Sequence, residues 1–307
     1  MFILKRYYPI SRYYRKRFGE KVYKVSVSIA ESCPNRQPNG RLLPCLFCDE
    51  WGSAAYHLER ERPLEEQIRI NRDRIARRYR ANRFLVYFQS YTNTFDRVAS
   101  LEERFETALA EDRICGLVLG TRPDCLPARI LPLLRSTHER SYLMVELGVQ
   151  SLFDHQLLFL QRGHDAARSI DGIRKLQGEA GVEVGVHLMF GLPRETDEQI
   201  VQTARRINAL SVSNVKLHNL HVLANTPLET LYRRGEFEPA TLEAYADRVV
   251  LFLRHLSPNI AVQRLAAVAN RWDELVAPDW TREKMRPSQY IEDRLEERDV
   301  RQGDLSD

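Results

Sequence analysis

Residues 24–48 read KVSVSIAESCPNRQPNGRLLPCLFC, a strand-like alternating run that leads directly into a cysteine-rich loop. The loop contains Cys33, Cys45 and Cys48 in a C-x11-C-x2-C pattern. Thiolates this close together in sequence bind soft metals. A structural zinc site usually needs four ligands, and four cysteines saturate a conventional iron–sulfur cluster. Three cysteines leave one coordination position open for a small molecule, which indicates a site built for chemistry.

The spacing alone leaves two other interpretations of these cysteines open. They could be coincidental, or they could bind zinc with His57 as a fourth ligand. A further cysteine, Cys125, follows a predicted strand and could either meet a substrate or pack as a small apolar side chain. We expect it to be buried, because free cysteines are among the most buried residue types.

The composition is that of a globular chain. Its 307 residues are 43% hydrophobic and 29% charged, which suits one large α/β domain or two small ones. Apolar runs are far shorter than the roughly 18 to 20 residues of a membrane span, and the first residues lack an apolar segment of signal-peptide length. Five cysteines in a chain of this size do not make a disulfide framework. We therefore expect a cytoplasmic, reducing setting and no membrane partner.

Positive charge is concentrated in two segments, although the net charge is only +4. The first interleaves basic residues with aromatic ones: Lys5, Arg6, Arg12, Arg15, Lys16, Arg17 and Lys21 beside Tyr7, Tyr8, Tyr13 and Tyr14. The second, at 69–83, has acidic neighbours, which favours a solvated helix face. Basic side chains neutralise phosphates, and aromatic rings stack on unpaired bases. The first segment therefore indicates an RNA partner, with an ordinary N-terminal arm as the alternative.

Strand-like and helix-like segments alternate along most of the chain. Helices are predicted at 64–82, 100–111, 154–160 and 166–178. Two more are predicted with one end defined: one begins at about 127, and the other ends at 210. Two of them begin with apparent capping boxes, Ser100 with Glu103 and Thr196 with Gln199. Strands are predicted at 24–29, 84–88, 115–119, 143–149, 182–189 and 214–222. Six strands separated by helices predict an α/β fold with a parallel sheet and right-handed crossovers.

Polar segments follow several of these strands, at 89–94, 120–124, 148–151 and 190–193. Ligands bind at the carboxyl ends of parallel strands in barrels and in open sheets alike. We therefore expect these segments and the cysteine loop to line one binding site at the carboxyl ends of the strands. The chain divides into a basic N-terminal arm at 1–23, a core domain at 24–280, and a charged C-terminal helix with a frayed tail at 281–307.

Short motifs, each weak alone, occur in order along the chain. They are SCPNR at 32–36, CLFC at 45–48, GTRPDC at 120–125, ELGVQ at 146–150, RGH at 162–164, GLP at 191–193 and VKLHNLHVL at 215–223. Together they resemble the radical S-adenosylmethionine (SAM) superfamily, and within it the YhcC/YtqA-type family, relatives of the Elongator catalytic subunit. The resemblance covers nearly the whole chain. It implies a partial (β/α)6 TIM-like barrel of parallel strands with a short C-terminal helical extension.

The resemblance also implies the cofactors. Cys33, Cys45 and Cys48 would hold three irons of a [4Fe–4S] cluster, and SAM would chelate the fourth. A one-electron donor such as flavodoxin or ferredoxin would reduce the cluster, which would cleave SAM to methionine and a 5′-deoxyadenosyl radical. Most of the superfamily spaces these cysteines C-x3-C-x2-C. The longer first gap here is shared with the YhcC/YtqA-type family.

Five residues are implied as SAM contacts. Phe47 would pack near the adenine, and Gly191 would let the backbone approach it closely. Gln150 would reach the ribose, and Arg162, twelve residues later, would clamp the SAM carboxylate. Glu146 would face the barrel interior, where a SAM hydroxyl or ammonium group would pair with it. Each has an ordinary structural alternative, such as loop packing, a helix cap, a turn glycine or a surface arginine.

The substrate that the resemblance implies is tRNA. The Elongator subunit modifies C5 of the wobble uridine, and members of the YhcC/YtqA-type family have been implicated in tailoring wobble-uridine side chains. We expect neither the acetyltransferase domain of the Elongator subunit nor the second cluster of a methylthiotransferase within these 307 residues. The alternatives are a radical SAM enzyme acting on a small molecule, and a non-catalytic Fe–S or zinc protein that binds nucleic acid.

Overall fold

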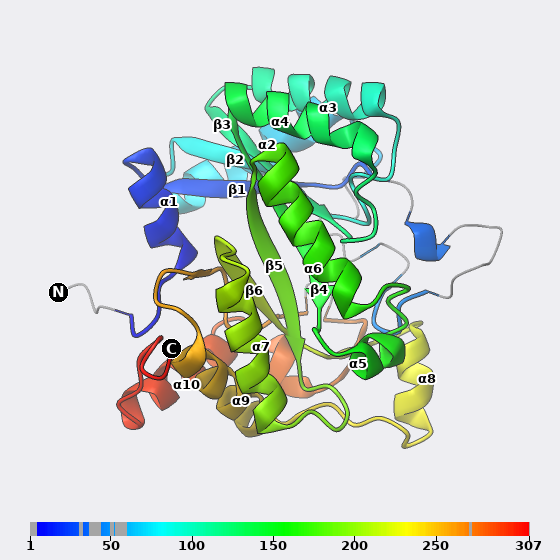
Figure 1. The fold of residues 1–307 in the computed structure, drawn as a ribbon, viewed down its shortest axis with the longest axis vertical. Helices are drawn as coiled ribbons and strands as arrows, with labels where there is room; N and C mark the ends of the chain where they lie inside the picture. Colours follow the sequence, from blue (N-terminus) through cyan, green and yellow to red (C-terminus); the bar gives the residue numbers. More distant parts are fainter. Residues whose placement is uncertain are drawn as a thin grey trace.

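Seven parallel strands form the main sheet, which curves into a half-barrel (Figure 1). The computed structural model describes residues 5–30, 33–36, 44–49, 52, 60–269 and 272–306. Neighbouring strands in the sheet follow the order of the chain, β1-β2-β3-β4-β5-β6-β8. Their bounds are β1 (Val22–Val27), β2 (Arg83–Phe88), β3 (Ile114–Thr121), β4 (Tyr142–Gln150), β5 (Glu183–Phe190), β6 (Asn214–Asn219) and β8 (Ala261–Val262).

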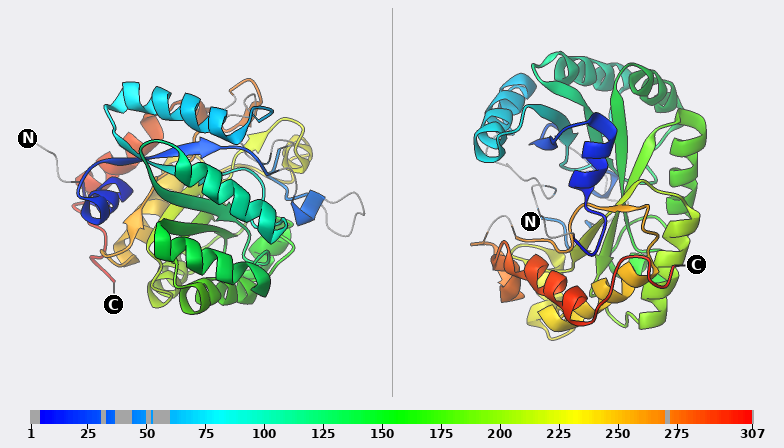
Figure 2. Two further views of the ribbon diagram at one scale, coloured as in Figure 1. Left: turned by 90° about the horizontal axis from the view of Figure 1, so that it is seen from above. Right: turned by 90° about the vertical axis from the view of Figure 1, so that its left-hand side faces the viewer.

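Helices surround the sheet on its outer side (Figure 2). Those that connect or follow the strands are α2 (Leu64–Tyr79), α3 (Val98–Ala110), α4 (Leu131–Arg140), α5 (Asp154–Phe159), α6 (Ala166–Lys175), α7 (Asp197–Ala209), α8 (Pro227–Arg233), α9 (Leu242–His255) and α10 (Arg286–Glu297). Short turns of other helix types are η1 (Pro34–Arg36), η3 (Ala128–Ile130), η4 (Leu176–Ala180) and η5 (Asp279–Arg282). None of the helices within the described residues is both long and apolar enough to cross a membrane.

The predicted α/β fold, a partial parallel barrel, is confirmed, and all six predicted strands are present. The sixth is shorter than expected. It ends at Asn219, and two residues later the chain forms β7 (Val222–Leu223), which pairs antiparallel with β9 (Leu275–Ala277). The seventh strand, β8, was not predicted. It consists of two residues, both paired with β6, and a strand this short shows no recognisable alternation of apolar and polar residues in the sequence.

One of the two predicted capping boxes is present. Thr196 and Gln199 exchange side-chain and backbone hydrogen bonds at the start of α7, as expected. The prediction for α3 was wrong, because that helix begins at Val98 and its N-cap, Arg97, has no side-chain cap. The preceding carboxylate of Asp96 instead accepts a hydrogen bond from the Arg97 amide at 2.7 Å. The chain therefore enters α3 before it reaches the predicted capping pair.

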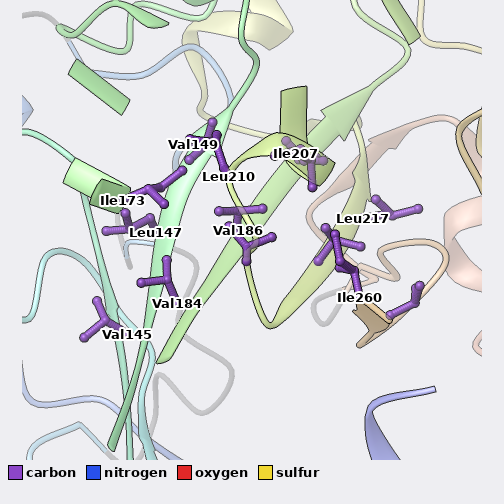
Figure 3. Close-up of a cluster of buried hydrophobic side chains, with 14 of the residues drawn as sticks. Val145, Leu147, Val149, Ile173, Val184, Val186, Ile207, Leu210, Leu217 and Ile260 are labelled. Atoms are coloured by element: carbon purple, nitrogen blue, oxygen red, sulfur yellow. The ribbon is translucent and has the colours of Figure 1, made fainter. Parts of the chain in front are cut away.

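Strand β4 shows how the two faces of the sheet are used. Successive side chains of a strand point to opposite faces. One set packs outward in the apolar cluster that α6 and α7 complete (Figure 3): Val145, Leu147 and Val149. The alternate set lines a cavity on the inner face: Glu146, Gly148 and Gln150. The apolar outer face thus fixes which polar side chains point inward.

The middle of the described N-terminal arm is a helix, α1 (Ile10–Phe18), which packs against the amino end of the half-barrel (Figure 2). Tyr14 is 3% exposed and packs among residues of β1 to β4. The Phe18 ring lies 5.0 Å from the ring of Tyr142, the first residue of β4. Tyr13 donates a hydrogen bond to Glu183, the first residue of β5.

The N-terminal arm therefore does not lie beside the cysteine loop. Helix α1 and η1, which follows Cys33, lie at opposite ends of the strands (Figure 1). The arm precedes β1, so it meets the amino end of that strand, whereas the cysteine loop follows the carboxyl end. The aromatic residues that suggested base stacking are used largely for internal packing.

The frayed C-terminal tail was also a wrong prediction. Gln302 is 8% exposed, and its side chain accepts a hydrogen bond from the Tyr8 amide at 2.8 Å. The same side chain donates to the carbonyls of Ser257 and Ile260, at 2.7 and 2.8 Å. One glutamine therefore ties the tail to the N-terminal arm and to the loop before β8.

Replacing Tyr14 tests the packing of α1. The ring is buried, but its hydroxyl has no hydrogen-bond partner among the described residues. We expect Tyr14→Ala to lower the free energy of unfolding by about 3–5 kcal/mol, as for other large aromatic truncations. Tyr14→Phe should be neutral or stabilising, because it removes an unsatisfied buried group. Urea denaturation measures both variants, and a Tyr14→Ala protein of wild-type stability would contradict a structural role for α1.

Candidate functional site

One cavity connects the cysteine loop to the interior of the half-barrel. Its volume is about 220 Å³, and Cys33, Cys45 and Cys48 all line it. Four other lining residues carry a buried polar atom with no hydrogen-bond partner among the described residues: Thr92 Oγ1, Arg162 Nε, Asn219 Nδ2 and His221 Nδ1. Buried polar atoms in proteins are normally satisfied, so these atoms indicate that the cavity receives a polar ligand.

Two residues of η1 hold the cysteine loop in place. Asn35 is 2% exposed, and its side-chain amide donates to Cys45 Sγ at 3.3 Å and to the Gln161 carbonyl at 2.9 Å. Arg36 donates to the carbonyls of Cys48, at 2.8 Å, and Asp49. The turn that follows the first cysteine is thereby joined to the segment that carries the other two.

Arg162 reaches the cysteine site from the segment after α5. It is 6% exposed and donates to Cys45 Sγ at 3.2 Å and to the Gly148 carbonyl at 2.9 Å. Its guanidinium carbon lies 5.9 Å from the centre of the Phe47 ring. The structure therefore brings together Arg162, Phe47 and the cysteines, as the sequence predicted, and the remaining Nε group of Arg162 is unpaired among the described residues.

Arg122 is a central residue of the site that the sequence analysis did not assign. It is 3% exposed and forms a two-bond ion pair with Asp124, at 2.9 and 2.8 Å. It also donates to the Asn35 side chain at 2.5 Å and to the Arg162 carbonyl at 2.7 Å. The motif at 120–125 placed Arg122 at the carboxyl ends of the strands, but nothing in the sequence indicated which distant residues it would join.

These surroundings fit a [4Fe–4S] cluster with three protein ligands. Hydrogen-bond donors directed at cysteine sulfurs stabilise thiolates and tune such clusters. Within the part of the chain that the structure describes, no three His, Cys, Asp or Glu side chains converge on a position for a single metal ion. Thiolates that each bind a different iron are spaced more widely than the ligands of one ion. His57, the alternative zinc ligand, lies outside the described residues.

The end of β4 is distorted in a way that brings Gln150 to the cavity. The register between β4 and β5 shifts between Leu147 and Gln150, and Gln150 has a φ of +67°. Such backbone angles are uncommon outside glycine and are often found at functional sites. A side chain added at Gly148 would come within 3.2 Å of Arg162 and 3.0 Å of the Gln150 amide, so glycine leaves room for both.

Glu146 is a fully buried carboxylate deeper in the cavity. It accepts hydrogen bonds from Lys24, from His187 Nε2 at 2.8 Å and from Gln263 Nε2 at 2.7 Å. Burial raises the pKa of a carboxyl group, but Lys24, His187 and Lys216 outweigh that effect and hold the pKa of Glu146 well below its usual range. Glu146 faces the interior as predicted. Its partners are protein side chains, so it does not need SAM to satisfy it.

Further basic side chains surround this carboxylate and were not predicted as site residues. Lys216 on β6 donates to the Tyr87 hydroxyl at 3.1 Å and lies 3.9 Å from Glu146. Arg264, just after β8, donates to the His218 ring, 2.6 Å from Nδ1. Burial lowers the pKa of His218 well below its ordinary value, so the ring is neutral at pH 7. The available signal was the alternation of Lys216 and His218 with apolar residues along one strand.

Two predicted positions lie away from the cavity wall. Gly191 is not among the lining residues, and its amide donates to Glu195 at 2.8 Å. Its φ of +84° fits the turn that follows β5. Contact of Gly191 with adenine therefore remains a prediction. Cys125 is 6% exposed and does not line the cavity, which confirms the expectation that it is buried.

Models of two protein families match this chain. The model of the radical SAM superfamily matches residues 27–207, which include β2 to β5, the three cysteines and Arg162. The model of the radical SAM C-terminal domain matches residues 212–297, which include the strands that carry Lys216 and precede Arg264. Together the two matched segments cover every strand of the half-barrel except β1, of which only the last residue is matched.

Several curated proteins are similar over most of their length. YtqA of Bacillus subtilis is 33% identical over 97% of this chain and 92% of its own length. YhcC of Escherichia coli K12 is 34% identical over 86% of this chain and 84% of its own length. The tRNA uridine(34) acetyltransferase of Methanocaldococcus jannaschii is 30% identical, but the match spans 52% of this chain and only 29% of that protein.

A solved structure supports the same fold. The archaeal Elp3 of Methanocaldococcus infernus superimposes with a TM-score of 0.69 at 19% identity, over 92% of this chain and 64% of that one. At this identity the likeness establishes the fold. Taken with the family models and the full-length relatives, it leads to one conclusion: the chain belongs to the radical SAM superfamily, in the family of YtqA and YhcC.

Proposed function

We propose that this protein is a radical SAM enzyme that modifies the side chain of the wobble uridine of tRNA. The observation that carries the enzymatic part is that one cavity combines three cysteines with buried polar atoms that have no hydrogen-bond partner among the described residues. Cys33, Cys45 and Cys48 would hold a [4Fe–4S] cluster, and SAM would bind beside it. When bound and reduced, the cluster supplies the electron that cleaves SAM to give a 5′-deoxyadenosyl radical.

The residues of the chain would bind SAM, orient it and enclose it. Arg162 donates to Cys45 and keeps its Nε group for a ligand, which suits a clamp on the SAM carboxylate. Gln150, held at the cavity by its left-handed backbone, would reach a ribose hydroxyl. Phe47 lies against the Arg162 guanidinium and would offer an apolar face to the adenine. An external one-electron donor, such as flavodoxin or ferredoxin, would reduce the cluster.

The tRNA part rests on the relatives. Two archaeal tRNA uridine(34) acetyltransferases are about 30% identical to this chain over half its length. The shared half suggests a common substrate class, and the unshared remainder of those proteins means that the reaction itself would differ. A wobble base reaching this cavity would have to leave its stack, as bases do when enzymes act on them.

The nucleoside content of tRNA tests this proposal. We expect tRNA from cells without the gene to accumulate a wobble uridine with an altered side chain, detected by liquid chromatography and mass spectrometry of digested tRNA. Restoring the wild-type gene should reverse the change, and restoring a Cys45→Ala gene should not. Identical nucleoside profiles in all strains would contradict a role in tRNA modification, and a small-molecule substrate would then become the leading hypothesis.

Variants of Arg162 and Gln150 test the SAM site. We expect Arg162→Ala to weaken SAM binding by about 1.5–3 kcal/mol, the scale of a charge-assisted hydrogen bond, and Gln150→Ala by about 0.5–1.5 kcal/mol. Equilibrium binding to the reconstituted protein measures both. Because Arg162 also contacts Cys45, the iron content of each variant must first match that of the wild type. Unchanged affinity at full iron content would overturn the assignment.

A further inference from the structure

The inner end of the cavity is lined by titratable side chains that the proposed SAM site does not use. They are Tyr87 of β2, Glu146 of β4, His187 of β5, Lys216 and His218 of β6, and Arg264 after β8, and Lys24 of β1 pairs with Glu146 beside them. Apolar layers usually fill the interior of a closed parallel barrel. A polar interior of this kind is costly to bury and therefore indicates a role in binding or chemistry.

The carboxylate in this group is already satisfied by its neighbours. One oxygen of Glu146 accepts from Lys24 and from Gln263, and the other accepts from His187. Lys24 in turn also donates to Gln263 at 2.6 Å. These residues form a closed network, so Glu146 and Lys24 have little hydrogen-bonding capacity left for a ligand.

Lys216 differs from Lys24 in its contacts. Its amine has one hydrogen bond among those the structure describes, to the Tyr87 hydroxyl at 3.1 Å, and lies 3.9 Å from the nearer Glu146 oxygen. An ammonium group can donate three hydrogen bonds. The side chain is 12% exposed and lines the same cavity as the three cysteines. Lys216 therefore has donor or acceptor capacity directed to the space where a substrate would lie.

The charges around Lys216 favour loss of its proton. Two other cations, Lys24 and Arg264, share this region with a single carboxylate, Glu146. Arg264 is in hydrogen-bond contact with a carbonyl and an imidazole, which carry no negative charge. Burial lowers the pKa of Lys216 to about 7. Glu146 raises it, and Arg264 and Lys24 lower it further. Near neutral pH the amine can thus take or give a proton.

We infer that Lys216 is a catalytic acid–base residue, which exchanges a proton with an N–H or O–H group of the substrate at the inner end of the cavity. In the uptake direction, the N–H or O–H bond of the substrate breaks, its electron pair stays on the substrate atom, and a new N–H bond forms on Lys216. In the return direction the ammonium gives the proton back. No oxidant or reductant is consumed in this step. The inference deepens the proposed function and rests on it.

The ionisation of Lys216 can be measured without turnover. The chain has only seven lysines, so the ¹⁵Nζ signal of Lys216 in the oxidised, cluster-loaded protein can be assigned by its loss in Lys216→Met. We expect its titration midpoint near 7, well below the reference value for a lysine of about 10.4. Arg264→Met should raise the Lys216 midpoint, and Glu146→Gln should lower it, because these changes remove opposite charges.

Turnover then tests the catalytic role, with tRNA from cells lacking the gene as substrate. Lys216→Arg keeps the positive charge but cannot release a proton near neutral pH. We expect it to reduce tRNA conversion by about 10²- to 10⁴-fold, the usual range for a lost acid–base group, mainly in kcat. The rates are compared at equal iron content of the variant and wild-type proteins. The matched control is Lys175→Arg, which should keep the wild-type rate and pH profile.

The outcomes separate the two proposals. A Lys216 midpoint near 10, or a Lys216→Arg enzyme with the wild-type rate and pH profile, would overturn the acid–base role while leaving the tRNA proposal in place. If wild-type protein cleaves SAM but converts no tRNA, the proposed substrate fails. A midpoint near 7 that moves as expected in Arg264→Met and Glu146→Gln would then still support an acid–base amine.

Discussion

A charged group inside a barrel must be satisfied by other groups inside the barrel, and Glu146 imposes that constraint on this fold. Its carboxylate is fully buried and draws partners from β1, from β5 and from the residues after β8. Removing one partner of such a pair typically costs about 3–5 kcal/mol, because the remaining charge is left uncompensated. The network therefore holds strands that are distant in sequence at fixed positions. It also replaces the apolar filling of an ordinary barrel with polar groups that border a cavity.

The two ends of the half-barrel have different roles. At the amino end, α1 packs aromatic rings against the starts of the strands. At the carboxyl end, Arg122 and Arg162 connect the cysteine loop to β3 and β4 through hydrogen bonds to Asn35, Cys45 and the Gly148 carbonyl. These bonds join the described residues of the cysteine loop to the half-barrel. Contacts of this kind suit a site that must place a reactive group accurately and keep water away.

The sequence was informative where a pattern is local. Alternation of side chains along β4 placed Glu146 and Gln150 on the inner face, and the Thr196–Gln199 pair marked the start of α7. It was uninformative where distant segments meet. Nothing local indicated that Arg122 would reach Asn35, that Gln302 would hold the tail, or that a two-residue strand would place Arg264 beside His218. Composition also does not say which end of a barrel a segment closes, so the basic, aromatic arm could not be located from the sequence.

The most direct test of this site is the ⁵⁷Fe Mössbauer spectrum of the reconstituted protein, recorded with and without SAM. Three cysteine ligands leave one iron of a four-iron cluster without a protein ligand. We expect about one quarter of the iron signal to change when SAM is added, with the remaining three quarters unaffected. Replacing Cys33, Cys45 or Cys48 by alanine should abolish the cluster. A spectrum in which all irons are insensitive to SAM, or a protein that takes up stoichiometric zinc and no iron, would contradict a radical SAM site at these three cysteines.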